Sequence, residues 1–356
     1  MRVLEVSAFV AAPLAGSTLA SVGTDVIRVD PIGGPIDQKR WPLDSQGNSL
    51  YWSGLNAGKR SILLDLRSAQ GRDLFEHLLL DDPEAGVLLT NNPNLDWVSH
   101  SILSEKRSDI ITCLILGHPD GTRAFDYTVN AAVGIPMITG DEGPPIDSVI
   151  PTWDIATGLH ATTQILAAAN RRLITGQGSE IRLSLFETAV STLNSLGMVE
   201  EIRDSGSGRP RIGNHLYGAL GRDFETSDGS RIMVAAISPN QVRGLLQLID
   251  YPIPETDDLP GYAYEHRETI STELNEWIKS RPPTEATSQL DQAGALVGPY
   301  QTMEELVMSE GPWAVGQLPD ASPAPRLGQH TDQILADHLG LNDIEIGRLR
   351  DQRVVG

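Results

Sequence analysis

The sequence predicts an α/β fold built around an open parallel sheet. Short apolar runs rich in Val, Ile and Leu alternate with amphipathic, helix-length segments over the first 200 residues. Strands that alternate with helices at this spacing pair in parallel and carry helices on both faces of the sheet. From about residue 217 a hairpin and a series of helical segments follow, which predicts a smaller α+β part of the chain.

The first third supplies five strands and the helices that connect them. Each strand is a short apolar run, and the segments between strands show apolar residues at helical spacing. The strands are expected over 2–9, 24–30, 60–66, 85–92 and 110–117, and the helices over 12–23, 68–82 and 96–109. The stretches 31–48 and 118–151 are rich in Gly and Pro and are expected to be loops.

The remaining elements follow in chain order after the second loop. They are a helix over 154–172, a strand and a helix within 179–202, a basic connector at 205–218, a hairpin over 221–237, helical segments up to 311 and one or two closing helices within 322–355. The hairpin is expected to turn at Asp228–Gly229, a pair typical of tight turns.

The charge of the chain limits its partners. It carries 47 Asp and Glu against 27 Lys and Arg, which gives a net charge of −20. Nucleic acid and anionic membranes both require a basic face, so neither is an expected partner. No apolar run reaches the roughly 18 residues of a membrane span. The absence of a signal-peptide pattern and a single cysteine, Cys113 in an apolar run, predict a cytoplasmic protein.

The usual motifs for cofactors and nucleophiles are missing from the sequence. It has neither the GxGxxG of dinucleotide-binding folds nor the GxxxxGK[ST] phosphate loop. The eight His residues are scattered without an HxxxH or HExxH pair, so no metal site is expected. A GxSxG nucleophile elbow is also missing, which argues against a serine hydrolase.

Basic residues are few, so the loops in which they gather are informative. Lys39 and Arg40 share one loop beside a strand, and Arg123 precedes Asp154 in the second loop. Solvated loop charges are the simpler interpretation. In so acidic a chain, several basic loops at one edge of the sheet would also suit phosphates and carboxylates.

Asp154, in the segment "PTWDIATG", has two interpretations. An Asp in the first turn of a helix accepts backbone N–H bonds and faces the favourable end of the helix dipole, so most such residues are caps. The same dipole would stabilise a carboxylate that awaits a carbonyl carbon, and Gly158 leaves room over the next turn. The residues alone leave both interpretations open.

Segments along nearly the whole chain resemble the class III CoA-transferases, the family that includes formyl-CoA and carnitine CoA-transferases and α-methylacyl-CoA racemase. The segments are "RVLEVSAFVAAPLAGSTLASVGTDVIRVDPIGG", "LNAGKRSILLDL", "LLTNN", "WDIATGLHATTQILAA", "YQTMEE" and "SPAPRLGQHTDQIL". Within the family, "SAFVAAPL", "PTWDIATG" and "GNHLYGALGRDFETSDG" resemble the subgroup that acts on mesaconyl-CoA.

The resemblance implies an interlocked homodimer whose large domain is Rossmann-like and formed by both chain ends. We expect this domain, with the CoA site, over 1–200, a small domain over 217–310, and a segment, 311–356, that returns to the large domain. Coenzyme A is expected as part of an acyl-CoA substrate, with no tightly bound cofactor.

The resemblance also implies roles for single residues. Asp154 matches the catalytic nucleophile of the family. The residues expected to line the CoA site are Val10, Ala11, Leu66, Arg67, Asn91 and Arg123. Those expected at the substrate's acyl end are Lys39 and Arg40, on grounds of charge, and Phe125, which stands where the racemase branch has a His.

The implied reaction moves CoA within or between small dicarboxylates through an acyl anhydride and a CoA thioester on Asp154. Because Phe125 replaces the racemase His, two-base proton exchange is disfavoured, with His118 and Asp126 as alternative bases. A racemase-type isomerase and an inactive CoA-binding homologue stay open as alternatives. Two departures from the family are a turn that reads "TNN" instead of "ENF" and a short stretch between "VMSEG" and "SPAPRLG".

Overall fold

The chain folds into two units, which are described separately. The structure, a computed structural model, describes residues 1–308, 310 and 323–356. The large unit contains 1–135, 147–208 and the described C-terminal residues, and the small unit contains 136–146 and the described residues from 209 to 310. The predicted boundaries at 200, 217 and 310 stay predictions, and 311–322, including the shortened stretch, lies outside the described residues.

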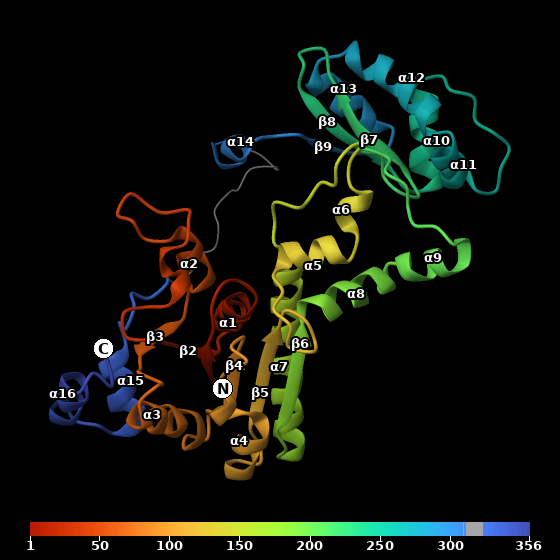
Figure 1. Cartoon of the computed structure of the whole chain (residues 1–356). Coiled ribbons are helices and arrows are strands. Elements are labelled where there is room, and N and C mark those ends of the chain that lie inside the picture. The colour runs from red at the N-terminus through yellow and green to blue at the C-terminus, as the bar shows by residue number, and fades with distance from the viewer. Residues whose placement is uncertain (309, 311–322) are drawn as a thin grey trace. The chain divides into compact units, whose positions relative to one another are not determined.

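A six-stranded parallel sheet forms the centre of the large unit (Figure 1). The strands are β1 (Arg2–Val6), β2 (Asp25–Asp30), β3 (Arg60–Leu63), β4 (Val87–Thr90), β5 (Ile111–Leu116) and β6 (Ser179–Ser184). Their order is β3-β2-β1-β4-β5-β6, and every neighbouring pair is parallel. The order reverses between β1 and β4, and α/β proteins bind ligands beyond the carboxyl ends of the strands at such a point.

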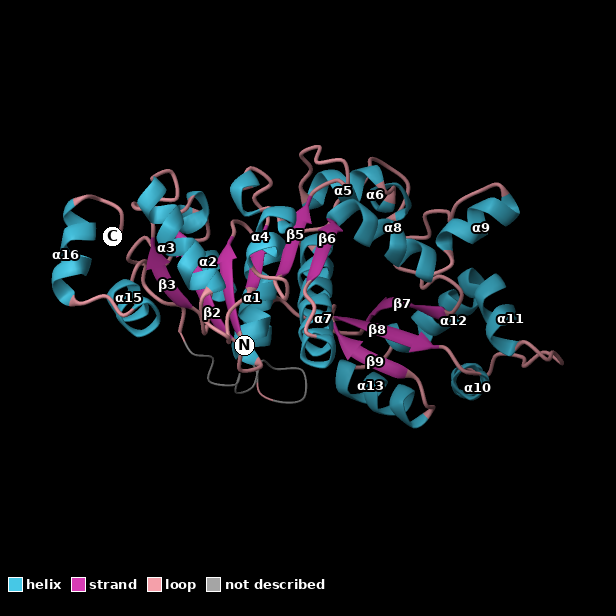
Figure 2. Cartoon of the chain, turned by 90° about the horizontal axis from the view of Figure 1, so that it is seen from below, coloured by secondary structure: helices cyan, strands magenta, loops and turns pink. Residues whose placement is uncertain are grey.

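Helices cover both faces of this sheet (Figure 2). On one face α1 and α7 pack over a core that includes Leu19, Val87 and Ile165. On the other face α3 and α15 pack over a core that includes Leu4 and Phe75. The helices of the large unit are α1 (Ala11–Ser21), η1 (Ile36–Lys39), α2 (Leu50–Leu55), α3 (Ala69–Leu80), η2 (Asp96–Val98), α4 (His100–Lys106), α5 (Asp126–Ala132), α7 (Thr152–Thr175), α8 (Leu185–Ser195), α9 (Met198–Ser205), α15 (Thr331–Leu339) and α16 (Asp343–Asp351). The short α6 (Ile135–Ile138) begins at the last residue before the small unit. The parallel sheet with two covered faces confirms the predicted fold class.

The C-terminal helices complete the β3 side of the sheet. The Leu63 N–H donates to the Thr331 hydroxyl at 3.2 Å, and Leu64 forms an isolated antiparallel bridge with Val355. Ile334 and Leu335 of α15 are fully buried in the core on this face. Both ends of the chain therefore contribute to the large unit, as the resemblance implied.

The small unit is an antiparallel sheet with helices. Its strands, in the order β7-β8-β9, are β7 (Leu220–Glu225), β8 (Arg231–Ala236) and β9 (Leu296–Pro299). Its helices are α10 (Pro239–Leu248), α11 (Leu259–Glu265), α12 (Arg267–Lys279), α13 (Pro283–Gln292) and α14 (Met303–Met308). Between β7 and β8 the chain turns through Gly229 at a φ of +85°, which confirms the predicted hairpin.

Short elements differ most from the sequence prediction, since η1 lies within the expected loop 31–48 and α2 was not predicted. The expected loop 118–151 contains α5 and α6, and the stretch expected to be helical near residue 296 contains β9. β9 has only four residues, and it is a strand because it pairs with β8. The helix expected from Asp154 begins two residues earlier, at Thr152.

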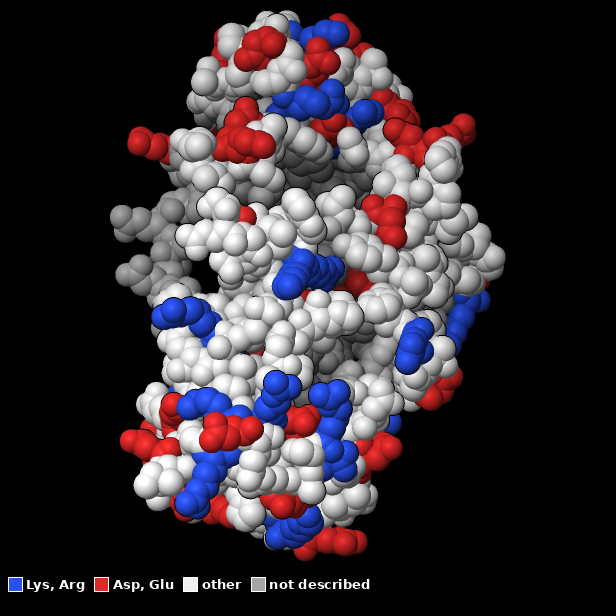
Figure 3. All heavy atoms as spheres, turned by 60° about the vertical axis from the view of Figure 1, so that its left-hand side comes forward, with Lys and Arg blue, Asp and Glu red and all other residues white. Residues whose placement is uncertain are grey.

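The surface of the protein carries charges of both signs, and its cysteine is buried. On the face in Figure 3, Lys and Arg side chains lie close to Asp and Glu side chains. In the described parts of the chain we find no helix with the length and hydrophobicity needed to span a bilayer. Cys113 is fully buried in β5, and burial raises the pKa of its thiol to about 12.

Candidate active site

A cavity of about 210 Å³ lies in the large unit beyond the carboxyl ends of β1, β4 and β5. This is the place where the strand order predicts a ligand site. Its wall is formed by Phe9, Ala11, Asn91, Pro93, Ile115, Leu116, Gly117, Gly121, Thr122, Arg123, Ala124, Phe125, Asp154 and Leu185. Pockets for drug-sized ligands measure about 300–1,000 Å³, so this cavity suits a small acyl group.

Asp154 reaches the cavity from the first turn of α7. The N–H of Ala11, the first residue of α1 and also part of the cavity wall, faces this carboxylate and favours its ionised form. Burial raises the pKa of Asp154 to about 7, and the negative charge of Asp126 adds to this, whereas Arg40 and the Ala11 N–H oppose it. A carboxyl group with a pKa this far above its ordinary value is typical of functional sites.

The Asp154 carboxylate does not cap its own helix. The N–H groups in the first turn of α7 have no partner within the helix, and Asp126 binds two of them. Its Oδ2 accepts from the Trp153 N–H at 2.5 Å and from the Asp154 N–H at 2.9 Å. The capping role that the sequence left open for Asp154 therefore belongs to Asp126. The side chain of Asp154 is turned toward α1 and the cavity instead.

Helix α5 holds the start of α7 at two points. Asp126 and Asn130 lie one helical turn apart, and the Asn130 Oδ1 accepts a hydrogen bond from the Trp153 indole N–H at 3.0 Å. The Asn130 Nδ2 donates in turn to Asp147 at 2.5 Å. Burial raises the pKa of Asp126, although its two N–H donors act in the opposite direction. These bonds fix the backbone that carries Asp154.

Arg40 brings positive charge to the site beside aromatic rings. Its guanidinium carbon lies 4.3 Å from the centre of the Tyr51 ring and 5.9 Å from that of Phe9. The Phe9 ring meets the Phe125 ring edge-on at 5.6 Å. Arg40 acts on the carboxyl of Asp154 by charge, and it could pair with a substrate carboxylate in the same way.

The structure brings most of the predicted residues together. Ala11, Asn91, Arg123 and Phe125 line the cavity with Asp154. The neighbouring Val10 is buried at the residue before α1, and Arg40 lies near Asp154 as described above.

Besides Val10 and Arg40, three further predicted residues do not line the cavity. Leu66 follows β3 and packs partly against the opposite core, and the adjacent Arg67 has a side chain that is 93% exposed and paired with Asp65 at 3.2 Å. Lys39 is exposed at the end of η1.

Sequence reasoning missed Phe9 and Tyr51, and it considered Asp126 only as a base. Phe9 could have been found, because it follows β1 just as Asn91 follows β4, and ends of parallel strands share one edge. Tyr51 belongs to a helix that the sequence did not reveal.

The alternative bases are engaged elsewhere. The His118 Nδ1 lies 2.8 Å from Oδ1 of Asp120, and its ring packs on Phe186 at 4.8 Å. Asp126 is occupied by the two N–H groups of α7. Across residues 1–308, 310 and 323–356, no group of three or more His, Cys, Asp and Glu is placed to hold a metal ion.

Comparison with known proteins identifies the family. The model of CoA-transferase family III matches residues 1–331. The chain belongs to CoA-transferase family III. This confirms the resemblance, and with it an enzyme that acts on CoA thioesters.

Individual members of the family match over their full length. The 2-methylfumaryl-CoA isomerase of Chloroflexus aurantiacus is 39% identical, covering 100% of this chain and 97% of the relative. The succinyl-CoA–D-citramalate CoA-transferase of the same organism is 27% identical with the same coverage. A CAIB/BAIF family protein from Brucella suis has a TM-score of 0.74 at 24% identity, over 95% of this chain and 98% of the other.

Proposed function

We propose that this family III enzyme moves CoA between the C1 and C4 carboxyl groups of mesaconyl-CoA, which is a 2-methylfumaryl-CoA isomerase activity. The observation that carries the proposal is the Asp154 carboxylate, which faces a cavity of acyl size beside the N-terminus of α1. The similarity to an isomerase of that name supports the choice of substrate.

The first half of the reaction detaches the acyl group from CoA. An oxygen of the Asp154 carboxylate attacks the thioester carbonyl, and the C–S bond breaks to give a mixed anhydride and CoA thiolate. The thiolate then attacks the aspartyl carbonyl. This releases mesaconate with a new C1 carboxylate and leaves a CoA thioester on Asp154.

The second half returns CoA to the other end of the same molecule. The C4 carboxylate attacks the aspartyl thioester, which forms a second anhydride and frees the thiolate again. The thiolate attacks the C4 carbonyl, which gives the C4 thioester and restores the Asp154 carboxylate. No proton is moved in these steps, so a second base is not required.

Each attack forms a tetrahedral oxyanion that needs hydrogen-bond donors. The Ala11 N–H at the start of α1 is a backbone donor that faces the reacting carboxyl, and it lies at the positive end of the helix dipole. Removal of one such donor typically costs about 2.7–4 kcal/mol of transition-state stabilisation. We assign this role to Ala11.

The free carboxylate of the substrate is proposed to bind Arg40, with Arg123 and Phe125 on the cavity wall. Lys39 is exposed to solvent outside the cavity, so it would contact only a part of the substrate that extends out of the cavity. The remaining predicted CoA residues are proposed to contact the CoA part of the substrate outside the cavity, and they are Val10, Leu66 and Arg67.

Oxygen labelling tests this mechanism directly. Each cycle takes one oxygen from the substrate's free carboxylate into Asp154, because the last attack leaves the bridging oxygen on the aspartyl group. Mesaconyl-CoA with an ¹⁸O-labelled free carboxylate should therefore label Asp154 in peptide mass spectra. Asp126 serves as an internal control, and it should stay unlabelled.

Three other outcomes would change the proposal. Turnover with no label in Asp154 would exclude it as the nucleophile. Incorporation of added ¹³C-mesaconate into the CoA ester would indicate transfer between molecules, the activity that the name of the succinyl-CoA–D-citramalate relative suggests. CoA binding without turnover would leave an inactive homologue.

We also propose that the enzyme is an interlocked homodimer. An apolar row along α7 supports the proposal, because Leu166, Leu173 and Ile174 are 41%, 86% and 76% exposed. Large exposed apolar side chains on one helix are typical of surfaces that bind another chain.

A further inference from the structure

The turn between β1 and α1, residues 7–10, has a strained backbone next to the reacting carboxyl. Phe9 has a φ of +66°, a left-handed conformation that residues other than glycine rarely adopt. Ala11, directly after the turn, lines the same cavity as Asp154, and its N–H faces the Asp154 carboxylate. A shift of the turn would therefore move this donor relative to the carboxylate.

Asn91 holds the middle of the turn from the end of β4. Its Oδ1 accepts a hydrogen bond from the Ala8 N–H at 3.0 Å, and its Nδ2 donates to the Ala8 carbonyl at 2.7 Å. Strand β4 lies beside β1, so this side chain bridges the two strands between which the order reverses. A primary amide supplies both the acceptor and the donor that this pairing needs.

Two charged side chains hold the residues on either side of Ala8. The Phe9 N–H donates to Oδ2 of Asp37 at 2.8 Å, and Arg28 donates to the Ser7 carbonyl at 3.1 Å. Three consecutive residues of the turn thus have a backbone group bound by a side chain from another segment. Such a set of bonds explains how the strained conformation persists.

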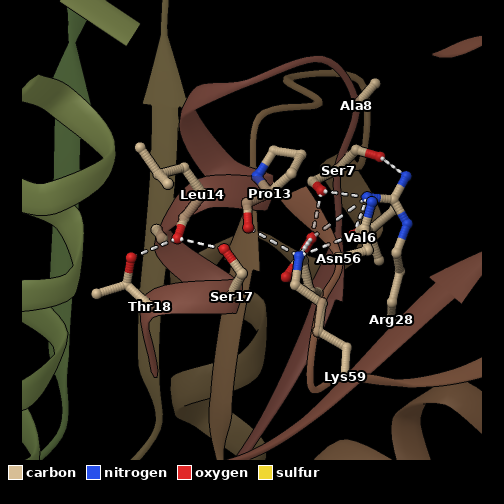
Figure 4. A network of polar contacts seen from close by, with 12 residues as sticks. Val6, Ser7, Ala8, Pro13, Leu14, Ser17, Thr18, Arg28, Asn56 and Lys59 are labelled. Atoms are coloured by element: carbon tan, nitrogen blue, oxygen red, sulfur yellow. Dashed lines mark hydrogen bonds and ion pairs between the residues drawn. The ribbon is translucent and has the colours of Figure 1, made fainter. Parts of the chain in front are cut away.

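Arg28 belongs to a buried network of charges (Figure 4). It is fully buried and donates to the carboxylate of Asp30 at 3.0 Å and to Asn56 at 2.8 Å. Lys59, also buried, donates to Glu5 at 2.8 Å. This network is a rigid frame behind the turn, because removing one member would leave another buried charge unpaired.

We propose that Asn91 is a positioning residue, which holds residues 7–10 so that the Ala11 N–H stays against the Asp154 carboxylate during the reaction. Only the kinetic consequences of this inference rest on the proposed function. Asp37 supports the same turn, but it also faces Arg28 at 3.7 Å, so its substitution would disturb the charge network. Asn91 is uncharged and partly exposed, which makes it the position to test.

The first test measures the titration of Asp154 and needs no substrate. Infrared difference spectra between a protein and its Asp154→Asn counterpart report protonation of this carboxyl group. Because the Ala11 N–H favours the ionised form, Asn91→Ala should raise the pKa of Asp154. An unchanged titration would overturn the proposal.

Other groups that face Asp154 stay the same in this comparison. They are Asp126 on α5, Arg40 after η1, Tyr51 on α2 and Arg123 on the cavity wall. A difference between wild type and Asn91→Ala therefore reports the position of the turn and its N–H group.

The second test separates positioning from CoA binding by kinetics. Asn91→Ala should lower kcat about 10- to 100-fold, because small displacements of catalytic donors have effects of this size. KM for mesaconyl-CoA should stay within about threefold. A raised KM at unchanged kcat would make Asn91 a CoA contact and contradict the positioning role.

Asn91→Asp adds a readout that loss of stability alone would not give. A protonated Asp carries one O–H donor and one acceptor, so it can pair with Ala8 as the amide does, whereas an ionised Asp cannot. The ratio of kcat for Asn91→Asp to kcat for Asn91→Ala should rise as the pH falls. A ratio independent of pH would count against the proposal.

Asn92→Ala is the matched control. The Asn92 Oδ1 accepts the Asn94 N–H at 3.0 Å within the next turn, so kcat should stay within about threefold of wild type. If the wild type does not convert mesaconyl-CoA, the proposed function fails, and the titration of Asp154 still decides whether Asn91 positions the turn.

Discussion

The single carboxyl group of Asp154 affects stability as well as chemistry. Its folded-state pKa is about 7 against an ordinary value of 3.8, so the folded chain binds a proton more tightly than the unfolded chain. Above pH 7 the group is ionised in both states, and its burial destabilises the fold. As the pH falls from 7 toward 4 this destabilisation fades, because the folded form becomes neutral first.

Asp154→Asn should therefore stabilise the protein at pH 8 by an amount on the order of a few kcal/mol, since it replaces the buried charge with a neutral amide. The gain should shrink at pH 5, and urea unfolding midpoints at the two pH values measure it. Asp120→Asn is a control of opposite sign, because hydrogen bonds from Thr122 lower the pKa of Asp120 to about 2. Equal stability of Asp154→Asn and wild type at pH 8 would contradict the prediction.

At this scale the sequence indicated the nucleophile but not its surroundings. Asp154 stood out through the resemblance to the family. The capping of α7 by Asp126 joins residues 28 positions apart, and the bond between Asn91 and Ala8 joins residues 83 apart. Neither contact follows a local spacing rule, so the sequence pattern could not reveal them.

Among the elements, the crossing of α1 and α7 sets the distance between the donor and the carboxylate. A Cβ atom at Gly158 of α7 would lie 2.6 Å from the Ala11 carbonyl oxygen and 3.3 Å from the Leu14 side chain. Gly158 lies one turn after Asp154, so this close contact places the carboxylate near the start of α1. Backbone atoms cannot move aside as a flexible side chain can.

Gly158→Ala should consequently destabilise the protein by about 1–2 kcal/mol. Overpacking typically costs about 1–3 kcal/mol, which outweighs the gain of about 1 kcal/mol in helix propensity. It should also lower kcat, because the two helices must move apart. Both effects are measured by urea unfolding and steady-state kinetics.

Gly347→Ala on α16 provides the matched control. A Cβ atom there meets nothing within 4 Å, so only the gain in helix propensity of about 1 kcal/mol is expected. Stabilisation by Gly158→Ala of the same size as by Gly347→Ala would show that the helix crossing is not tight.

Long elements were predictable and short ones were not. The five early strands and α7 have strong apolar patterns, whereas α5 and α6 occupy a Gly- and Pro-rich stretch. The four residues of β9 have no alternating pattern, and their strand conformation comes from pairing with β8. Tertiary contacts decide such short segments.

For the whole molecule, the apolar row on α7 predicts the assembly state. Light scattering after size-exclusion chromatography should give a mass of about twice the 38.5 kDa of one chain. The double variant Leu166→Glu, Leu173→Glu should reduce it to one chain, because buried charges at an interface are unfavourable. Ile344→Glu, at a 69% exposed position of α16, should leave the dimer intact. A wild-type mass of one chain would refute the homodimer.

The overall topology was only partly predictable. Alternating strands and helices predicted a parallel sheet, but the order β3-β2-β1-β4-β5-β6 depends on which strands meet in space. That order decides where the cavity lies, since it brings the ends of β1 and β4 together. The resemblance supplied what local patterns lacked, namely that the C-terminal helices return to the large unit.

The buried thiol of Cys113 has a practical and a chemical consequence. It is the chain's sole cysteine, and at ordinary pH it stays protonated inside β5. Coenzyme A released at the site would meet no reactive thiol with which to form a mixed disulfide. Oxidising conditions should therefore not attach coenzyme A covalently to the protein. A cysteine engineered at the cavity rim would then react alone with a fluorescent maleimide and report ligand entry without background.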